Sequence, residues 1–479
     1  MNRLFPLMLA ALALATPASA QISAFQHVII VIQENRTPDN LFQGLCPPTN
    51  PSACSTHPSS QQYNIQTTGW LDKTSKTGTT NPRPVPFGVE FDLTHIHSAF
   101  VRQCDMNGAG VCAMDGAAYV GCTKRSIGCP KKAAFTYVDN STGSVQPYID
   151  IAHAYGWGNY MFQTNQGPSF PAHQYLFGAT SAPTGRDDHN GIFASGNTPI
   201  HDVHNGGCAS APTAKVPLIN PEGVEFGETF PCFNRRTLAD LLDAQKVSWR
   251  YYGVILLDGG IWMAPNAIKH ICVAVDQNCT GNQWTKGVDP NPLDVLSDIS
   301  TNCKLRGVSW VTPDAQDGDH MGRVTNTGGP SWVASIINAV GNSKCTNPDG
   351  SSYWSTTAII VTWDDWGGCY DHERPFVEPY PQGGYQLGFR VPLLVVSAYT
   401  PRGFISNFRE DFGSVVRFVE RNFGIMEGAL TFADARADSD LREFFSLGNP
   451  PRQFQPINAP LSAKYFLSAK PSGLPVDDD

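Results

Sequence analysis

Hydrophobic residues recur along the chain in short continuous runs, which is typical of strands buried on both faces of a sheet. The clearest runs are residues 25–33, 247–252, 308–311, 358–362 and 391–396. Each ends abruptly in polar or glycine-rich sequence. These runs therefore predict the core strands of a sheet that is covered on both sides.

Helical patterns separate the predicted strands. Apolar residues at helical spacing occupy residues 146–153, 237–244, 262–270, 331–340 and 414–422. Strands that alternate with helices predict an α/β fold with a mostly parallel central sheet. Because neither an internal repeat nor a linker of distinct composition interrupts the chain, we expect one domain over residues 21–479.

Acidic and amide side chains follow two of the predicted strands. Glu34 and Asn35 come directly after the first run, and Asp364 and Asp365 follow the run that ends at Trp363. Ligands of parallel sheets bind beyond the carboxyl ends of the strands. Adjacent carboxylates repel each other, and their oxygens are ligands that divalent metal ions prefer. A solvated acidic turn and a helix cap pair are the simpler interpretations of each segment alone.

Ser169 stands at the start of a predicted helix, after the turn Gly167-Pro168. The unpaired N–H groups and positive dipole of a helix N-terminus stabilise a phosphate oxyanion. Serine is also a common helix cap, so the local sequence leaves both roles open.

Several histidines lie near these segments. His95 and His97 alternate within a few residues of Asp92, which could orient an imidazole. His320 follows the strand predicted at residues 308–311. His270 closes a helical pattern, where it could equally cap the helix. Carboxylates, a serine and histidines at strand ends together favour metal-assisted ester hydrolysis.

Composition narrows the class of protein. The chain has 479 residues, of which 41% are hydrophobic and 16% charged, with 44 glycines and 37 prolines. This composition predicts a globular protein with long loop excursions. The net charge of −9 argues against a nucleic-acid-binding surface.

The first twenty residues have the pattern of a secretory signal peptide. Arg3 precedes an apolar run at residues 4–16, and Ala18-Ser19-Ala20 forms a cleavage site. The run is too short to span a membrane, and we expect no transmembrane segment elsewhere. Residues 1–20 therefore predict export to the periplasm or the medium.

The 13 cysteines all follow the predicted signal peptide, which fits an oxidising compartment. Neighbours in sequence suggest six short-loop disulfides: Cys46/Cys54, Cys104/Cys112, Cys122/Cys129, Cys208/Cys232, Cys272/Cys279 and Cys303/Cys345. Cys369 remains without a partner. None of the spacings is typical of a zinc site.

Four segments carry a resemblance to a known family. They are ENRT at 34–37, DLTHIH at 92–97, GPSFPAHQYL at 167–176 and DDWGGCYDH at 364–372. In this order they resemble the bacterial phosphoesterase family, which includes phospholipases C and a group of acid phosphatases. The family belongs to the alkaline-phosphatase-like superfamily. The resemblance implies a three-layer α/β/α sandwich.

The resemblance also implies roles for residues of this chain. Ser169 would be the nucleophile and would form a covalent phosphoseryl intermediate. Histidines near the phosphate would be His95 and His320, with His270 matched only by order and spacing and His372 ranked lower. The implied metal ligands are Glu34, Asn35, Asp364, Asp365 and the Ser169 oxygen. The identity of the metal stays open.

These expectations lead to an exported, metal-dependent phosphoesterase, above all one similar to the acid phosphatases. Its substrate would be a small phosphate ester or a phospholipid headgroup. The phospholipases of the family carry further C-terminal domains for which this chain has no room, and Ala172 stands where the family usually has Asn. A phospholipase C is the alternative enzyme. A non-catalytic binding protein braced by a metal is the alternative of another class.

Overall fold

A computed structural model of the chain describes residues 24–108, 110–197, 206–255, 259–322, 328–381, 384–474 and 476–477. The predicted signal peptide, residues 1–20, lies outside the described residues. Among the described residues, no helix combines the length and the apolar character needed to cross a membrane.

The core is an eight-stranded sheet with the strand order β13-β10-β14-β1-β15-β18-β6-β19. In that order the strands are Val288–Asp289, Trp249–Tyr252, Val308–Val311, His27–Gln33, Thr357–Trp363, Leu393–Ser397, Gly156–Phe162 and Phe404–Asp411. The strands from β13 to β15 run parallel to one another, and β19 runs parallel to β6. Strand β18 is antiparallel to both of its neighbours. The predicted, mostly parallel sheet is confirmed.

Burial on both faces explains why the sequence pattern predicted these strands. Every residue of β1 and of β15 is buried, because helices cover both faces of the sheet. A strand in this position reads as a continuous apolar run rather than an alternating one. The direction of β18 has no such local signal, since an apolar run reads the same in either direction.

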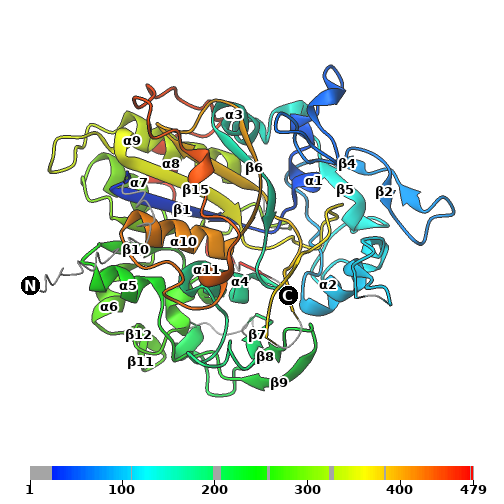
Figure 1. Cartoon of the computed structure of the whole chain (residues 1–479), viewed down its shortest axis with the longest axis horizontal. Helices are drawn as coiled ribbons and strands as arrows, with labels where there is room; N and C mark the ends of the chain where they lie inside the picture. Colours follow the sequence, from blue (N-terminus) through cyan, green and yellow to red (C-terminus); the bar gives the residue numbers. More distant parts are fainter. Residues whose placement is uncertain are drawn as a thin grey trace, which may run out of the picture.

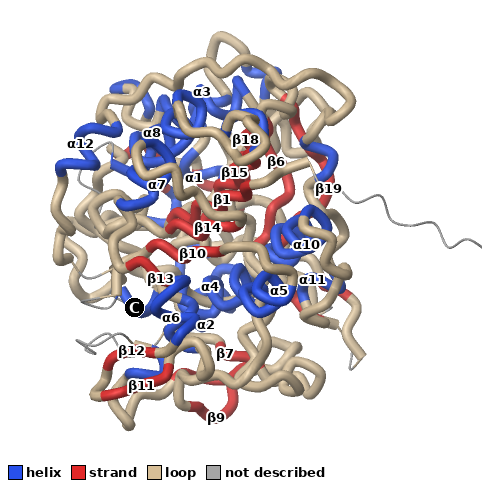
Figure 2. The backbone as a smooth tube through the Cα atoms, turned by 90° about the vertical axis from the view of Figure 1, so that its left-hand side faces the viewer, coloured by secondary structure: helices blue, strands red, loops and turns tan. Residues whose placement is uncertain are grey.

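Two helical layers enclose the sheet (Figures 1 and 2). One layer contains α3 (Gln146–Ala154), α7 (Asp294–Ser300), α8 (Gly328–Asn342) and α9 (Tyr353–Thr356). The other contains α4 (Ser169–Gly178), α5 (Leu238–Ala244) and α10 (Phe412–Asn422), which lie on the opposite side of the sheet from α7 and α8 in Figure 2. The arrangement is the expected three-layer α/β/α sandwich.

Short elements lie in the loops and around the sandwich. The helices are α1 (Pro38–Leu41), α2 (His97–Cys104), α6 (Asn282–Gly287), α11 (Ala433–Arg436) and α12 (Ala463–Ser468). The strands are β2 (Trp70–Leu71), β3 (Thr79–Thr80), β4 (Arg83–Val85), β5 (Thr136–Val138), β7 (Phe193–Ala194), β8 (Val216–Ile219), β9 (Glu225–Thr229), β11 (Val273–Val275), β12 (Asn278–Thr280), β16 (Val377–Glu378) and β17 (Tyr385–Gln386).

The helix predicted at residues 262–270 is wrong. Only a 3₁₀ turn, Ala264–Ala267, forms there. Pro265 has no N–H to donate, and Asn266 turns its side-chain amide back onto the Gly260 carbonyl at 2.7 Å. A local side-chain bond of this kind competes with helix formation.

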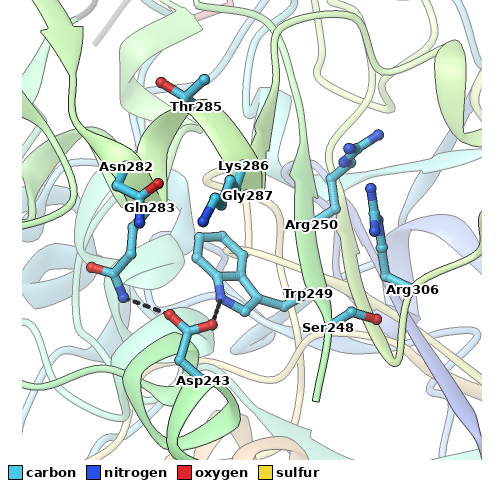
Figure 3. Close-up of a pocket in the computed structure, with 10 residues that line it drawn as sticks. All are labelled: Asp243, Ser248, Trp249, Arg250, Asn282, Gln283, Thr285, Lys286, Gly287 and Arg306. Carbon is cyan, nitrogen blue, oxygen red and sulfur yellow. Dashed lines mark hydrogen bonds between the residues drawn. The ribbon is translucent and has the colours of Figure 1, made fainter. Parts of the chain in front are cut away.

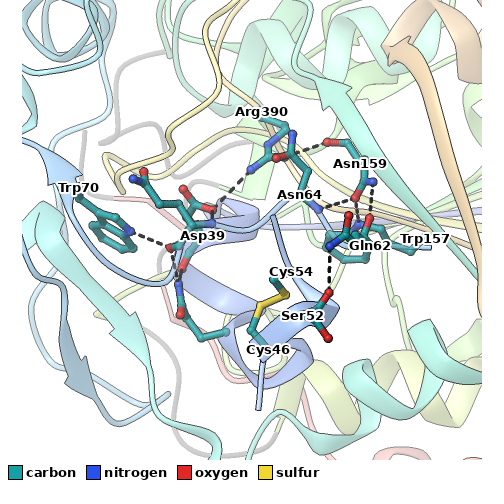
Figure 4. The surroundings of a disulfide bond; sticks show 12 residues. Asp39, Cys46, Ser52, Cys54, Gln62, Asn64, Trp70, Trp157, Asn159 and Arg390 are labelled. Carbon is teal, nitrogen blue, oxygen red and sulfur yellow. Dashed lines mark hydrogen bonds and ion pairs between the residues drawn. A yellow bond between two sulfur atoms is a disulfide. The ribbon is translucent and has the colours of Figure 1, made fainter. Parts of the chain in front are cut away.

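All six predicted disulfides are present, and Cys369 is free and buried. Figure 4 shows the first of them, Cys46–Cys54, in the loop that follows α1. This loop is tied to strand β6 by Asn159, which accepts from the Asn64 N–H at 2.7 Å and donates to the Gln62 carbonyl at 2.9 Å. The excursion is therefore ordered although it has almost no regular structure.

Candidate functional site

Strands β14, β1 and β15 are neighbours in the sheet and end at the same edge. The polar segments that follow them therefore meet, as their positions after strands predict. The Asn35 N–H, beyond β1, donates to Asp364 Oδ1, beyond β15, at 3.1 Å. We call Glu34, Asn35, Asp364 and Asp365 the oxygen cluster. All four side chains are fully buried.

The two loops of the oxygen cluster interlock through unusual backbone conformations. Gly367 has a φ of +60°, and a Cβ at this position would lie 2.2 Å from the Asn35 carbonyl oxygen. Its N–H donates to Asp365 Oδ1 at 2.7 Å. Asn35 also has a φ of +60°, a conformation that Asn tolerates better than most residues. The tight turn at this glycine places Asp364 and Asp365 against Glu34 and Asn35.

Ser169 is the first residue of α4, and Pro168 takes the N-cap position. The interpretation of Ser169 as a helix cap is therefore wrong, since the Oγ donates instead to Asp365 Oδ2 at 3.4 Å. Ser169 is completely buried. Its hydroxyl thus faces the oxygen cluster.

The oxygen cluster contains acceptors that nothing satisfies. Both carboxylate oxygens of Glu34, Asn35 Oδ1 and Asp364 Oδ2 have no hydrogen-bond partner among the described residues. Burial, followed by repulsion from Asp364, raises the pKa of Glu34 well above its usual value, and the same causes raise the pKa of Asp365. Buried acceptor oxygens without hydrogen-bond donors destabilise the fold, and a cation bound between them removes that cost. Carboxylate and amide oxygens are also the ligands that divalent metal ions such as calcium and magnesium prefer.

His95 and His320 lie beside the oxygen cluster, with ring centroids 5.6 Å apart. His95 Nδ1 lies 2.8 Å from the Leu93 carbonyl oxygen, and its Nε2 lies 3.1 Å from Asn35 Nδ2. His320 Nδ1 lies 2.7 Å from the Met321 carbonyl oxygen. Both predicted histidines are therefore within the site.

A carboxylate that the sequence did not indicate lies between these histidines. Asp477 Oδ2 is 3.3 Å from His95 Nε2, and Asp477 Oδ1 is 3.5 Å from His320 Nε2. Asn197 donates to the same carboxylate at 2.6 Å and accepts from the Phe170 N–H at 2.9 Å. Burial alone would lower the pKa of His320, but the carboxylates of Asp92 and Asp477 raise it to about 9. A protonated His320 thus faces an anion.

His173 is a second site residue that sequence reasoning missed. It is fully buried on α4, and its Nε2 lies 3.6 Å from Glu34 Oε1 and 3.7 Å from Asp364 Oδ2. A signal was available, because His173 stands four residues after Ser169 and so lies on the same face of the helix.

His270 does not join the site. Its side chain is 39% exposed, and its Nε2 lies 2.8 Å from Asp240 Oδ1 on helix α5. The catalytic role expected for His270 finds no support in this position, because a contact with Asp240 at the surface already accounts for the side chain.

His372, which the resemblance ranked lower, and His97 also have structural partners. His372 Nδ1 lies 2.7 Å from Asp39 Oδ2, within a network that includes Arg390. His97 lies between the carbonyl oxygens of Gln166 and Gly223, at 2.9 Å from each.

A polar pocket of about 600 Å³ lies at the opposite edge of the sheet, beside Ser248 and the start of β10 (Figure 3). Asp243 accepts there from Trp249 Nε1 at 3.0 Å and from Gln283 Nε2 at 2.8 Å. None of the residues that line this pocket is a member of the site described above.

Comparison with known proteins gives a family match and several relatives. The model of the phosphoesterase family matches residues 25–426. The non-hemolytic phospholipase C of Pseudomonas aeruginosa is 29% identical over 47% of this chain and 34% of that protein. Phospholipase C B of Mycobacterium tuberculosis is 26% identical over 50% of each chain. The matched region therefore spans half or less of these relatives.

A plant protein and a solved structure complete the comparison. The non-specific phospholipase C1 of Arabidopsis thaliana is 29% identical over 26% of this chain and 27% of that protein. A solved protein in the alkaline phosphatase superfamily from Vibrio parahaemolyticus has 12% identity, covers 59% of this chain and 63% of its own, and gives a TM-score of 0.31. With the family model matching most of its length, this chain belongs to the phosphoesterase family.

Proposed function

We propose that this protein is an exported, metal-dependent hydrolase of phosphate esters that uses Ser169 as its nucleophile. The observation that carries the proposal is the Ser169 hydroxyl, which is buried and lies 3.4 Å from Asp365 within a cluster of unsatisfied oxygens. Membership of the phosphoesterase family supports the same class of reaction.

The reaction would proceed in two displacements at phosphorus. Ser169 Oγ attacks the phosphorus, and the bond to the leaving alcohol breaks as that alcohol gains a proton. Water then attacks the phosphoserine, which releases phosphate and restores the hydroxyl. When a divalent ion is bound by the oxygen cluster and the serine oxygen, it supplies a lower pKa for the hydroxyl and charge neutralisation at the phosphate.

His95 and His320 would bind non-bridging phosphate oxygens or transfer protons. The Asp477 carboxylate supports this role, because it already places an anionic group between the two imidazoles. A phosphate group in the same place would face His320, whose Nδ1 lies 3.8 Å from Asp92 Oδ1, and this carboxylate raises the pKa of the imidazole against the burial that lowers it.

Export would place the protein in the periplasm or the medium. Six disulfides support this location, because disulfides persist in oxidising compartments. Within the reaction class, a phosphatase acting on monoesters is the first candidate. A phospholipase C that cleaves headgroup phosphodiesters is the second, and the names of the bacterial and plant relatives favour it.

Removal of the nucleophile tests the proposal. We expect Ser169→Ala to lower kcat for p-nitrophenyl phosphate, or for p-nitrophenyl phosphorylcholine, by about 10³-fold or more. Ser181→Ala is the matched control, because this buried hydroxyl donates to the Ala194 carbonyl outside the site. Release of p-nitrophenol from both esters, with and without a chelator, is the measurement.

The outcomes separate the candidate functions. Hydrolysis of only the choline ester would favour the phospholipase C. Full activity in Ser169→Ala would remove the serine from the mechanism. A wild-type protein that binds metal but hydrolyses neither ester would support the non-catalytic, metal-braced binding protein instead.

A further inference from the structure

Helix α4 presents a nitrogen atom to the oxygen cluster one turn after Ser169. His173 Nε2 lies 3.6 Å from Glu34 Oε1 and 3.7 Å from Asp364 Oδ2, and each of the three residues offers a ligand atom within 4.8 Å of the other two. His173 Nε2, Glu34 Oε1 and Asp364 Oδ2 have no hydrogen-bond partner among the described residues. Three buried polar atoms thus converge without a donor between them.

The neighbours of the other ring nitrogen determine where the imidazole proton lies. Tyr251 donates its hydroxyl hydrogen to the Trp262 carbonyl oxygen at 2.7 Å. A tyrosine hydroxyl has only one hydrogen, so its oxygen must accept at its second contact, His173 Nδ1 at 3.1 Å. Nδ1 therefore carries a proton. In the neutral imidazole, Nε2 then offers a lone pair.

A lone pair directed at two carboxylate oxygens is repulsive unless a cation lies between them. Two atoms that each lie about 2.1 Å from the same ion are at most about 4.2 Å apart. The separations of 3.6 and 3.7 Å around His173 Nε2 are within that limit, so one ion can contact all three side chains. Metal-binding histidines commonly donate their second N–H to a fixed acceptor, which is the contact that Tyr251 makes here.

We propose that His173 Nε2 is a direct nitrogen ligand of the metal ion, beside Glu34 and Asp364, and that Tyr251 fixes its tautomer. The inference rests on the proposed function and deepens it by naming the class of metal. Imidazole suits zinc, iron and similar transition ions, whereas magnesium and calcium take oxygen ligands. The site therefore selects a transition-metal ion over magnesium or calcium.

Metal titration of the full chain tests the inference without measuring turnover. We prepare metal-free wild type, His173→Gln and Tyr251→Phe, and titrate Zn²⁺ by competition with a chromophoric chelator and Mg²⁺ by calorimetry. His173→Gln should bind Zn²⁺ at least about 30-fold more weakly, with Mg²⁺ affinity changed less than about threefold. Tyr251→Phe should lose about 10-fold in Zn²⁺ affinity, as variants that lose a ligand's orienting contact do.

His27→Gln is the matched control. His27 is a buried histidine at the start of β1, at the far end of the strand that leads to Glu34, and it contacts the Arg306 carbonyl and Asn347. Its replacement should leave Zn²⁺ affinity unchanged. X-ray absorption at the zinc edge gives a second readout, because scattering from a coordinated imidazole should be present in wild type and in His27→Gln and reduced in His173→Gln.

Three outcomes would overturn, in turn, the nitrogen ligand, the metal selection and the proposed function. Wild-type Zn²⁺ affinity with unchanged imidazole scattering in His173→Gln would overturn the nitrogen ligand and leave the metal site intact. Equal losses of Zn²⁺ and Mg²⁺ affinity would overturn the metal selection. A wild-type protein that binds neither ion would instead overturn the metal-dependent function on which the inference rests.

Discussion

At the scale of single residues, Asp364 uses its two carboxylate oxygens in different ways. Oδ1 accepts the N–H groups of Asn35 at 3.1 Å and of Asp365 at 2.7 Å. Oδ2 has no hydrogen-bond partner among the described residues and lies 3.7 Å from His173 Nε2. Two backbone donors thus hold the side chain in place while its second oxygen remains available to a cation.

Asp365→Asn should have opposite effects with and without metal. In the metal-free protein it replaces a buried carboxyl group that is costly to ionise, because burial and the neighbouring Asp364 raise its pKa. We therefore expect the Tm to rise by a few degrees. Metal affinity should fall about 100-fold. Added metal should therefore raise the Tm of the variant less than it raises the Tm of the wild type. Calorimetry with and without a chelator, together with metal analysis, measures both effects. Metal content equal to wild type would show that Asp365 is not a ligand.

Cys369 should resist thiol reagents in the folded protein. Its side chain is fully buried, and burial raises the pKa of the thiol to about 12, so almost no thiolate is present at neutral pH. We expect no labelling by a disulfide reagent in the native state and one labelled thiol per chain after denaturation. Rapid labelling of the native protein would mean that the loop after Asp365 opens in solution.

At the scale of elements, disulfides and side-chain contacts hold the loops where regular structure is sparse. Cys303–Cys345 joins cysteines 42 residues apart, with β14 and α8 between them, whereas Cys122–Cys129 joins cysteines only 7 residues apart. In the chain-entropy model, a longer closed loop restricts the unfolded chain more. The two bridges should therefore contribute differently to stability although their chemistry is the same.

The double variant C303A/C345A should lower the free energy of unfolding more than C122A/C129A does. The expected difference is about 1.5 kcal/mol, because the loop lengths differ sixfold. Denaturant unfolding under oxidising conditions measures both values. Equal losses would indicate that native contacts, rather than the entropy of the unfolded chain, determine what each bridge contributes.

At the scale of the whole molecule, segments from distant parts of the chain meet at one edge of the sheet. Glu34 follows the first strand, Ser169 begins α4, and Asp477 belongs to the last described residues. Ser169, His95, His320 and Asp477 have no exposed surface. A phosphate ester that binds to the two histidines must therefore displace the Asp477 carboxylate.

Asp477→Asn should make the site more accessible to phosphate. A tethered carboxylate lowers the fraction of protein that can bind an anion, and apparent affinity falls by the same factor. We expect KM for p-nitrophenyl phosphate and the inhibition constant of inorganic phosphate to decrease together, by about fivefold, with a smaller change in kcat. Asp438→Asn is the control, because its side chain is 52% exposed. Unchanged values of both constants would show that Asp477 does not compete with substrate.

The sequence by itself determined those features that depend on local order. Strands covered on both faces produce continuous apolar runs, so β1, β14 and β15 and the polar residues after them were recognisable. Short separations between cysteines were enough to predict the disulfides, since nearby residues meet most easily. The resemblance that four segments carry implied roles for Ser169 and for the histidines His95 and His320.

Only the tertiary structure decided which of these groups meet. The order of strands in a sheet depends on crossover connections, which no local sequence pattern records. The antiparallel direction of β18 could not be predicted for the same reason. His270 lies outside the site: the helix predicted around it does not form, and its side chain contacts Asp240 on α5. His173 and Asp477 belong to the site through contacts with segments far away in the sequence, which no local pattern predicts. Examples are the contacts of Tyr251 with His173 and of His95 with Asp477.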